Sequence, residues 1–265
     1  MTPTLPYRHL RFLRPTPVEV ERCREIVQGT TGIVARHFNK RFSLPMSLVL
    51  ARLGMKPNPI TYFNMLVGLL SGFLAWRGTP LSVVMAGVLF QLASVLDGVD
   101  GEVAKFNRSG SQWGQWLDTI GDTLTFFLFV IGLTLGLYRS VGHPWILWTG
   151  EIAVFSSLMF AGIMLVFLKK NSGSGSFVTY DRAFVGRVAA ERGPLATFVR
   201  YGRYFIKKDA FAMIFFLLTL AGWPEGVLLM TALGTTTACG LMLYFNVSRR
   251  VSVSPLQLAK EADVS

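Results

Sequence analysis

Residues 97–122 read DGVDGEVAKFNRSGSQWGQWLDTIGD, and this segment joins two apolar stretches of the chain, residues 81–103 and 113–138. Four of its residues are aspartates, at positions 97, 100, 118 and 122. Acidic side chains are costly within a membrane-spanning stretch and usually mark a functional site there. Because only a short polar turn, residues 107–112, separates the two stretches, we expect an antiparallel helix hairpin that carries acids near its turn.

The composition is typical of a membrane protein. Hydrophobic residues make up 51% of the 265 residues and charged residues only 15%, whereas soluble domains carry roughly 25% charged residues. An aromatic content of 13% excludes a disordered chain, and two cysteines are too few for a disulfide scaffold. The class that remains is an all-α integral membrane protein.

Six apolar stretches predict six transmembrane helices, since a helix needs about 20 residues to cross a bilayer. The stretches are residues 59–76, 81–103, 113–138, 145–168, 210–223 and 227–247. The fifth is short unless it includes part of residues 201–209. We therefore expect a cytosolic or interfacial segment 1–57, a six-helix transmembrane domain 58–250 that carries the acids, and a cytosolic tail 251–265.

The N-terminal segment predicts amphipathic helices. Residues 17–40 place apolar and charged side chains on different stripes, and Thr16 before Pro17 fits a helix cap followed by proline. A second short amphipathic piece covers residues 44–53. Helices of this type can lie flat in a membrane interface, whereas an ordinary soluble core has too little chain here to form. We expect an N-terminal amphipathic interfacial helix.

The basic residues predict which side of the membrane each loop faces. The chain carries 26 Lys and Arg against 15 Asp and Glu, a formal charge of +11. Only Arg77 and Arg139 lie in the loops after the first, third and fifth stretches. The positive-inside rule then places both termini and the acidic site at the cytoplasmic face, and we expect a bacterial inner membrane. Because the positive charge gathers on one face, anionic lipid or phosphate is a better partner than nucleic acid.

The spacing of the acids brings them together in the predicted hairpin. Asp97 and Asp100 are three residues apart and Asp118 and Asp122 four apart, so each pair shares one helix face. Counted from Ser109 at the tip, Asp100 and Asp118 lie at equal depth, and Asp97 and Asp122 nearly so. We therefore expect all four carboxylates to converge just below the cytoplasmic surface.

Four carboxylates in an apolar place need cations to balance them, because like charges repel. Oxygen ligands suit hard divalent cations, so we expect two ions of Mg²⁺ or Mn²⁺. Paired metal ions near the cytoplasm favour phosphoryl-type chemistry. Two other interpretations stay open: acids that pair with Lys105 and Arg108 to hold the helices together, and a divalent-cation transporter. With Glu102 included, five acids would face only the two cations Lys105 and Arg108, which argues against the helix-packing interpretation. Transport sites usually lie near the membrane midplane, whereas these acids lie toward one face, which argues against a transporter.

The motif resembles the signature of the CDP-alcohol phosphatidyltransferases. The matching residues are Asp97, Gly98, Asp100, Gly101, Ala104, Gly114, Asp118 and Asp122. One position departs, because the family usually has arginine where this chain has Lys105, which keeps the charge but loses the forked geometry. Pro57, Asn58 and Thr61 resemble the family's entry to its first helix, and the six stretches and the N-terminal helix agree with it.

The resemblance implies an enzyme that cleaves a CDP-linked donor at its pyrophosphate, passes the substituted phosphate to a hydroxyl acceptor and releases CMP. It implies that Asp97, Asp100 and Asp118 hold the metal ions. It also implies that Asp122 contacts the second ion and acts as general base on the acceptor hydroxyl. The positions it assigns to the nucleotide and donor are Asn58, Thr61, Gly98, Gly101, Lys105, Ser111 and Gly114.

The resemblance also bears on the substrates. Most of the family uses a lipid donor, which favours CDP-diacylglycerol and a role in phospholipid biosynthesis. Residues 39–45, NKRFSLP, resemble the branch that joins inositol phosphate units, so a CDP-inositol-type phosphotransferase making a soluble or lipid inositol phosphodiester is the alternative. The basic segment Arg182 to Lys208 predicts a second interfacial or cytosolic helix, where we expect a phosphate-bearing acceptor to bind. Membrane lipids and a second copy, as a homodimer, complete the expected partners.

Overall fold

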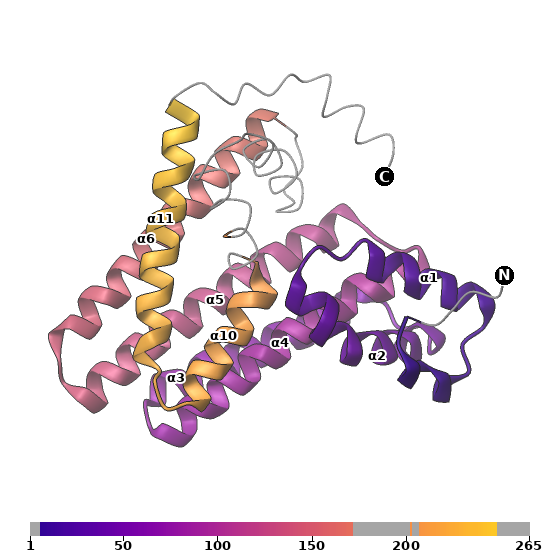
Figure 1. Ribbon diagram of the computed structural model, residues 1–265, viewed down its shortest axis with the longest axis horizontal. Helices are drawn as coiled ribbons and strands as arrows, with labels where there is room; N and C mark the ends of the chain where they lie inside the picture. The colour runs from indigo at the N-terminus through magenta and orange to yellow at the C-terminus, as the bar shows by residue number, and fades with distance from the viewer. Residues whose placement is uncertain (1–5, 172–201, 203–206, 248–265) are drawn as a thin grey trace. The chain divides into compact units, whose positions relative to one another are not determined.

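A computed structural model describes residues 6–171, 202 and 207–247, and within these ranges every regular element is a helix (Figure 1). The predicted all-α class is therefore confirmed. The predicted helix in the basic segment falls almost wholly outside the described residues. The elements are η1 (Arg8–Leu13), α1 (Pro17–Gln28), η2 (Ala35–Asn39), α2 (Lys40–Arg52), α3 (Pro57–Arg77), α4 (Pro80–Asn107), α5 (Gln112–Val141), α6 (Pro144–Asn171), α10 (Lys208–Leu220) and α11 (Glu225–Val247).

Four segments within these helices are long and apolar enough to cross a membrane: Pro57–Arg77, Pro80–Asn107, Gln112–Val141 and Pro144–Ile163. The first three are the whole of α3, α4 and α5, and each contains the stretch predicted for it. The fifth and sixth apolar stretches correspond to α10, which has 13 residues, and α11, which has 23. The predicted integral membrane character is therefore supported, with four candidate spans among the described residues.

The chain divides into two compact units, and α5 passes from one into the other. The first comprises residues 1–136 and 207–224, and the second residues 137–206 and 225–265. In the second unit α6 packs along α11, where Ser156 Oγ lies 2.5 Å from Thr235 Oγ1. The first unit contains the acidic hairpin, so it carries the candidate site.

The N-terminal helix is shorter than predicted. Thr16 and Glu19 form a reciprocal cap at the start of α1, as the Thr16–Pro17 pair predicts, with Thr16 N donating to Glu19 Oε2 over 2.7 Å. The prediction of one helix over residues 17–40 is wrong, because α1 ends at Gln28 with Gly29 as its C-cap. Two glycines and two threonines follow at residues 29–32, and both residue types favour leaving a helix. Helical structure resumes at residue 33 and runs into α2, which begins earlier than the predicted residue 44.

Helix α4 is the centre of the first unit, and α2, α3 and α10 all pack against it. Five phenylalanine rings from α4, α5 and α10 pack together: Phe90, Phe126, Phe129, Phe211 and Phe215. The ring centroids of Phe90 and Phe129 are 4.5 Å apart, and those of Phe90 and Phe215 are 5.6 Å apart. Phe211 joins the same cluster from α10. This aromatic packing fixes the start of α10 close to the hairpin.

A seam of glycines lets α3 and α5 approach closely. A Cβ atom added at Gly72 would lie 3.0 Å from the backbone of Leu128, and one added at Gly132 would meet the Gly72 carbonyl oxygen. One turn away, a Cβ at Gly68 or Gly136 would likewise meet the facing helix. Both helices thus carry the small-xxx-small spacing that favours close packing in membranes. We call these four glycines the α3–α5 seam.

Candidate metal centre

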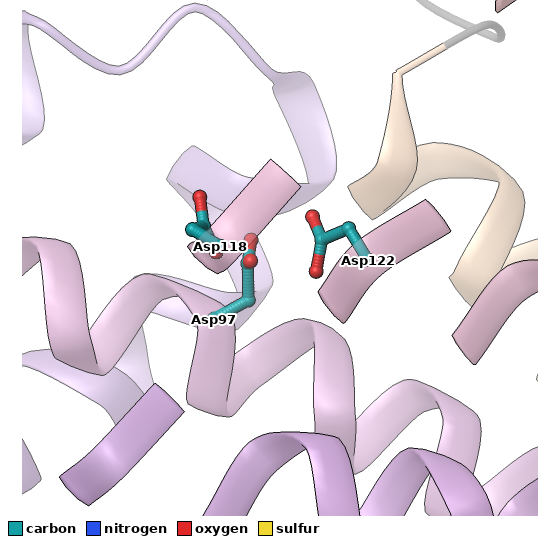
Figure 2. A group of neighbouring side chains, drawn as sticks. All are labelled: Asp97, Asp118 and Asp122. Atoms are coloured by element: carbon teal, nitrogen blue, oxygen red, sulfur yellow. The ribbon is translucent and has the colours of Figure 1, made fainter. Parts of the chain in front are cut away.

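Three of the four predicted acids meet at one point between α4 and α5 (Figure 2). Asp97 comes from α4, and Asp118 and Asp122 come from successive turns of α5. One carboxylate oxygen of each lies within 4.8 Å of the other two. Figure 2 shows the side chains pointing toward one another from the two helices. The antiparallel hairpin inferred from the sequence therefore brings together acids that lie more than twenty residues apart.

The polar turn between the helices is held by local hydrogen bonds. Arg108 ends α4 in a left-handed conformation with φ of 50°, and Ser109 N donates to Ala104 O over 3.0 Å. Ser111 then accepts from Gly114 N over 3.0 Å at its Oγ, which satisfies an amide in the first turn of α5. The turn thereby fixes where α5 begins, and so the depth of Asp118 and Asp122.

Asp100 lies beside this group but is engaged differently. Thr61 Oγ1 on α3 donates to Asp100 Oδ2 over 2.5 Å, and Gly101 N donates to its Oδ1 over 2.6 Å. Three residues rotate a helix position by about 60°, so Asp100 faces α3 while Asp97 faces α5. The expectation that all four carboxylates converge holds for three of them. Thr61, predicted to contact the donor, is hydrogen-bonded to a predicted metal ligand.

A lysine lies within the acidic cluster, and it is not one that we predicted there. Lys208, the first residue of α10, has its ammonium 2.9 Å from Asp97 Oδ1, and it donates a hydrogen bond to Asp122 Oδ1. The contact with Asp97 is an ion pair without hydrogen-bond geometry. Among the described residues, the ion pairs at the cluster involve Lys208 rather than Lys105 or Arg108. The sequence signal for this is position, because Lys208 lies two residues before the apolar stretch 210–223, just as the acids flank theirs.

The donor set fits a hard divalent cation. Asp97 Oδ1 and Asp118 Oδ1 are both buried, and neither accepts a hydrogen bond from any residue that the structure describes. The Lys208 ammonium lies 2.9 Å from Asp97 Oδ1, whereas no ion pair or hydrogen bond to Asp118 Oδ1 is found among the described residues. Buried carboxylate oxygens are normally satisfied, so Asp118 Oδ1 is open to a cation. Three carboxylates face one ammonium, which leaves negative charge to be neutralised. Oxygen ligands with this charge suit Mg²⁺ or Mn²⁺.

Several of the predicted donor-binding positions lie together at the start of α3 and α5. A Cβ atom at Gly114 would lie 3.2 Å from Ser111 Oγ and 3.4 Å from Asn58 Oδ1, so these three residues are neighbours. A Cβ at Gly101 would meet no atom within 4 Å, because this residue borders open space. Lys105 is exposed one turn further along α4.

Gly98 belongs to different surroundings, on the side of α4 that α2 covers. Its nearest side-chain neighbours are Glu102, Ser43 and Lys40, at 3.4, 3.5 and 3.6 Å from an added Cβ. Glu102 is only 2% exposed and is fully engaged. Its Oε1 accepts from Lys40 Nζ over 2.5 Å and from Ser43 Oγ over 2.6 Å, and its Oε2 accepts from Ser47 Oγ over 2.7 Å. We call this group the Glu102 site.

Sequence reasoning missed the Glu102 site, although a signal for it exists. Lys40, Ser43 and Ser47 are spaced so that they share one face of α2, opposite the apolar residues that a lone interfacial helix would bury. A polar face made of one cation and two hydroxyls fits a single buried carboxylate. Asn39 extends the same face, where its Nδ2 donates to Ser94 Oγ over 3.2 Å. These bonds fix α2 on α4, on the side of the helix opposite the aspartate cluster.

Comparisons with known proteins agree with the geometry. A family model described as CDP-alcohol phosphatidyltransferase matches residues 55–238. A bifunctional IPC transferase and DIPP synthase of Thermococcus kodakarensis is 34% identical over 150 residues, which are 54% of this chain and 33% of the relative. The protein of the same name from Aquifex aeolicus is 27% identical over 237 residues, 86% of this chain and 49% of the relative.

An archaetidylinositol phosphate synthase of Pyrococcus horikoshii is 30% identical over 87 residues, 33% of this chain and 45% of the relative. The chain thus spans about half or less of the length of each of these relatives. The family match is broader, since residues 55–238 take in α3, both acidic helices and more than half of the chain. By this match and by its acidic hairpin, the chain belongs to the CDP-alcohol phosphatidyltransferase family.

Proposed function

We propose that this protein is a membrane enzyme that moves a substituted phosphate group from a CDP-linked donor to an alcohol. The acceptor oxygen bonds to the phosphorus that bears the donor's alcohol, the bond from that phosphorus to the CMP oxygen breaks, and CMP leaves. The observation that carries the proposal is the cluster of Asp97, Asp118 and Asp122, which faces one ammonium and in which the buried Asp118 Oδ1 accepts no hydrogen bond from the described residues. Such an arrangement has more negative charge than a structural role requires.

Each acid has a distinct task in this proposal. Asp97, Asp118 and Asp100 hold divalent cations, two ions of Mg²⁺ or Mn²⁺, and Thr61 orients Asp100 through its hydrogen bond. Bound cations neutralise phosphate charge and lower the energy of the transition state. Asp122 would also contact the second ion, and its carboxylate would take the proton of the acceptor hydroxyl. A general base needs a free lone pair within reach of that proton.

The CDP part of the donor is proposed to bind where α3 and α5 begin. Asn58, Ser111 and Gly114 lie together there, and the open space beside Gly101 suits a ligand. The N-terminus of α5 adds amide groups that favour phosphate. Lys105 supplies positive charge, and Gly98 contributes only through the backbone of α4.

The donor is proposed to be a lipid, CDP-diacylglycerol, and α2 supports this. Its outward side carries an exposed apolar stripe, while its buried side combines the polar residues of the Glu102 site with Leu44 and Leu48. The stripe residues are Phe38, Phe42, Met46, Val49 and Leu53, each at least 39% exposed. A helix whose exposed side is apolar is best placed against lipid. The stripe thus favours an interfacial α2 beside the site, where a lipid donor arrives.

The relatives' names favour an inositol phosphate unit as the polar partner. One relative is called an archaetidylinositol phosphate synthase, and the others are called bifunctional IPC transferases and DIPP synthases. A CDP-inositol-type transfer that makes a soluble or lipid inositol phosphodiester is therefore the second candidate. In both cases we propose that the basic segment Arg182 to Lys208 binds the acceptor's phosphate.

The membrane arrangement completes the proposal. We propose six spans, with α10 and α11 contributing the fifth and sixth, both termini in the cytoplasm of a bacterial cell, and the site at the inner face of its inner membrane. The parts are then residues 1–57, 58–250 and 251–265, and the enzyme works as a homodimer. Reporters fused after Ser265 and inserted at residues 172–176 should both read cytoplasmic, and cross-linking in membranes should give a dimer band.

The test is an assay of the purified full chain with Mg²⁺ and a panel of CDP-linked donors and alcohols, scored by CMP release. CDP-diacylglycerol with an inositol phosphate should give CMP, and Asp118→Asn should abolish it. CMP released only with CDP-inositol would select the second candidate. Divalent-cation flux into liposomes, with no CMP from any donor, would replace the enzyme with a transporter.

A further inference from the structure

Lys208 holds a position that the proposed metal site needs for a cation. Its ammonium lies 2.9 Å from Asp97 Oδ1 and donates to Asp122 Oδ1, so it bridges the two helices of the hairpin from a third. The side chain is only 22% exposed, and those of Asp97 and Asp122 are similarly covered. A positive charge between two half-buried carboxylates is what a divalent ion would also provide.

The backbone around Lys208 is anchored on both sides. Lys207 Nζ donates to Thr31 Oγ1 over 2.7 Å, and Asp209 Oδ2 accepts from Ala35 N over 2.6 Å. One turn further along α10, Phe211 and Phe215 enter the aromatic cluster with Phe90. Since the start of α10 is fixed, the ammonium can leave the acids by rotation of its own side chain, without moving the helix.

We propose that Lys208 is a built-in counter-cation that holds the acidic cluster together before metal binds and must be displaced when metal binds. The inference rests on the proposed metal-dependent function. Without a cation the three carboxylates would repel one another in a poorly solvated place. With Lys208 present the metal-free site is stable, but every divalent ion that bridges Asp97 and Asp122 competes with the ammonium.

The alternative is that Lys208 is a permanent part of the loaded site and adds no competition. In that case a metal would be held by Asp118 and Asp100 while the ammonium stays in place. The two possibilities predict opposite effects of removing the charge. Competition predicts that metal binds more tightly without Lys208, whereas a permanent ion pair predicts unchanged or weaker binding.

The experiment measures Mn²⁺ binding by electron paramagnetic resonance, at one fixed pH, to the full chain in detergent. Lys208→Met keeps the length of the side chain and removes its charge, so the dissociation constant should fall about tenfold. Lys208→Arg keeps the charge and should stay near the wild-type value. Lys207→Met is the matched control, because it removes one positive charge at the same helix start from a side chain that bonds to Thr31.

The thermal unfolding of the same samples without metal gives an independent readout. Lys208→Met should lower the unfolding midpoint, and Asp122→Asn added to it should raise the midpoint again by removing one of the repelling charges. If Lys208→Met cannot be purified alone, Mn²⁺ binding is compared between Asp122→Asn and the double variant. The double variant should then bind more tightly.

Two results separate this inference from the proposed function. If the wild type binds Mn²⁺ and Lys208→Met binds it equally or more weakly, Lys208 does not compete and the inference fails while the function stands. If the wild type binds no Mn²⁺ and releases no CMP, the metal-dependent function itself fails. The competition falls with it, even where the midpoints still show that Lys208 neutralises the acids.

Discussion

Helix α4 carries two buried acidic sites on opposite sides, and they differ in how their charge is balanced. Glu102 is a single carboxylate that accepts from one ammonium and two hydroxyls, all within 2.7 Å. On the other side, the one ammonium of Lys208 contacts Asp97 and Asp122, and the buried Asp118 Oδ1 accepts no hydrogen bond from the described residues. Both sites involve residues of one short motif, separated by five positions along one helix.

The difference separates a structural acid from a functional one without reference to any relative. A buried ion pair that is fully hydrogen-bonded holds two helices in register and offers nothing to a ligand. A cluster with more acids than cations is unstable on its own and is retained where something else supplies the missing charge. If this distinction is right, substitutions on the two sides of α4 should fail in different ways.

The largest expected effect is on turnover, at Asp118. Asp118→Asn keeps the size of the side chain but removes a charge from the cluster, so metal affinity and turnover should fall together. We expect a loss of CMP release on the order of 10³-fold, because the substitution removes transition-state charge stabilisation. Asp97→Asn should behave in the same way. Normal turnover in either variant would show that catalysis does not depend on the charge of these acids.

Asp122→Asn should reduce turnover by at least ~10²-fold, the lower end of what a general base contributes. Binding of the donor with metal should survive largely intact, since Asp97 and Asp118 remain. Single-turnover measurement of CMP formation at saturating metal, alongside donor binding, checks this. Turnover near the wild-type rate would leave Asp122 as an outer support of the metal site.

On the other side of α4, Glu102→Gln should reduce stability rather than chemistry. It leaves the Lys40 ammonium buried without its counter-charge, which typically costs several kcal/mol. We expect the unfolding midpoint to fall by about 5–10 °C, while the folded fraction keeps its turnover. The matched control is Glu102→Gln with Lys40→Met, which removes both charges and should recover part of the midpoint. A variant that stays stable but inactive would place Glu102 in the chemistry.

The smallest effect is expected at the surface, where Glu19 and Arg52 pair. Hydrogen bonds from Arg52 lower the pKa of Glu19 to about 2, against an ordinary value near 4.5. A lowered pKa in the folded state means that the pair stabilises the fold above pH 4.5 and that this contribution is lost as pH falls toward 2.

The measurement compares the unfolding midpoints of the wild type and Glu19→Gln across that range of pH. The variant should melt about 2 °C lower at neutral pH, because exposed pairs contribute little. The difference should disappear by pH 2. A difference that persists there would mean that the side chain acts through packing rather than charge.

Much of the membrane part follows from the sequence alone. Hydropathy located α3, α4 and α5 closely, and the spacing of Asp97, Asp118 and Asp122 across a short turn was enough to predict their meeting. These inferences work because they depend on helix periodicity and on the contact between neighbours joined by a tight turn.

The remaining features depend on helices that are distant in sequence. Periodicity places Asp100 about 60° from Asp97 around α4 but does not reveal that Thr61 on α3 engages it. Lys208 lies 86 residues from Asp122 along the chain, and Lys40 lies 62 from Glu102. The end of α1 at Gly29 was missed because the apolar stripe continues beyond residues 29–32, whose glycines and threonines end the helix.

The α3–α5 seam has a consequence for the order in which the helices can pack as the protein is synthesised and inserted into the membrane. Because α3 docks against α5 through glycines 68, 72, 132 and 136, it meets its partner only after α4 and α5 have been synthesised and inserted. Until α5 arrives, α3 can already pack on α4, where Thr61 meets Asp100, but its glycine face has no partner. A larger residue at Gly132 would therefore act during biogenesis, because it would delay the docking of α3 on α5 after both helices have entered the membrane.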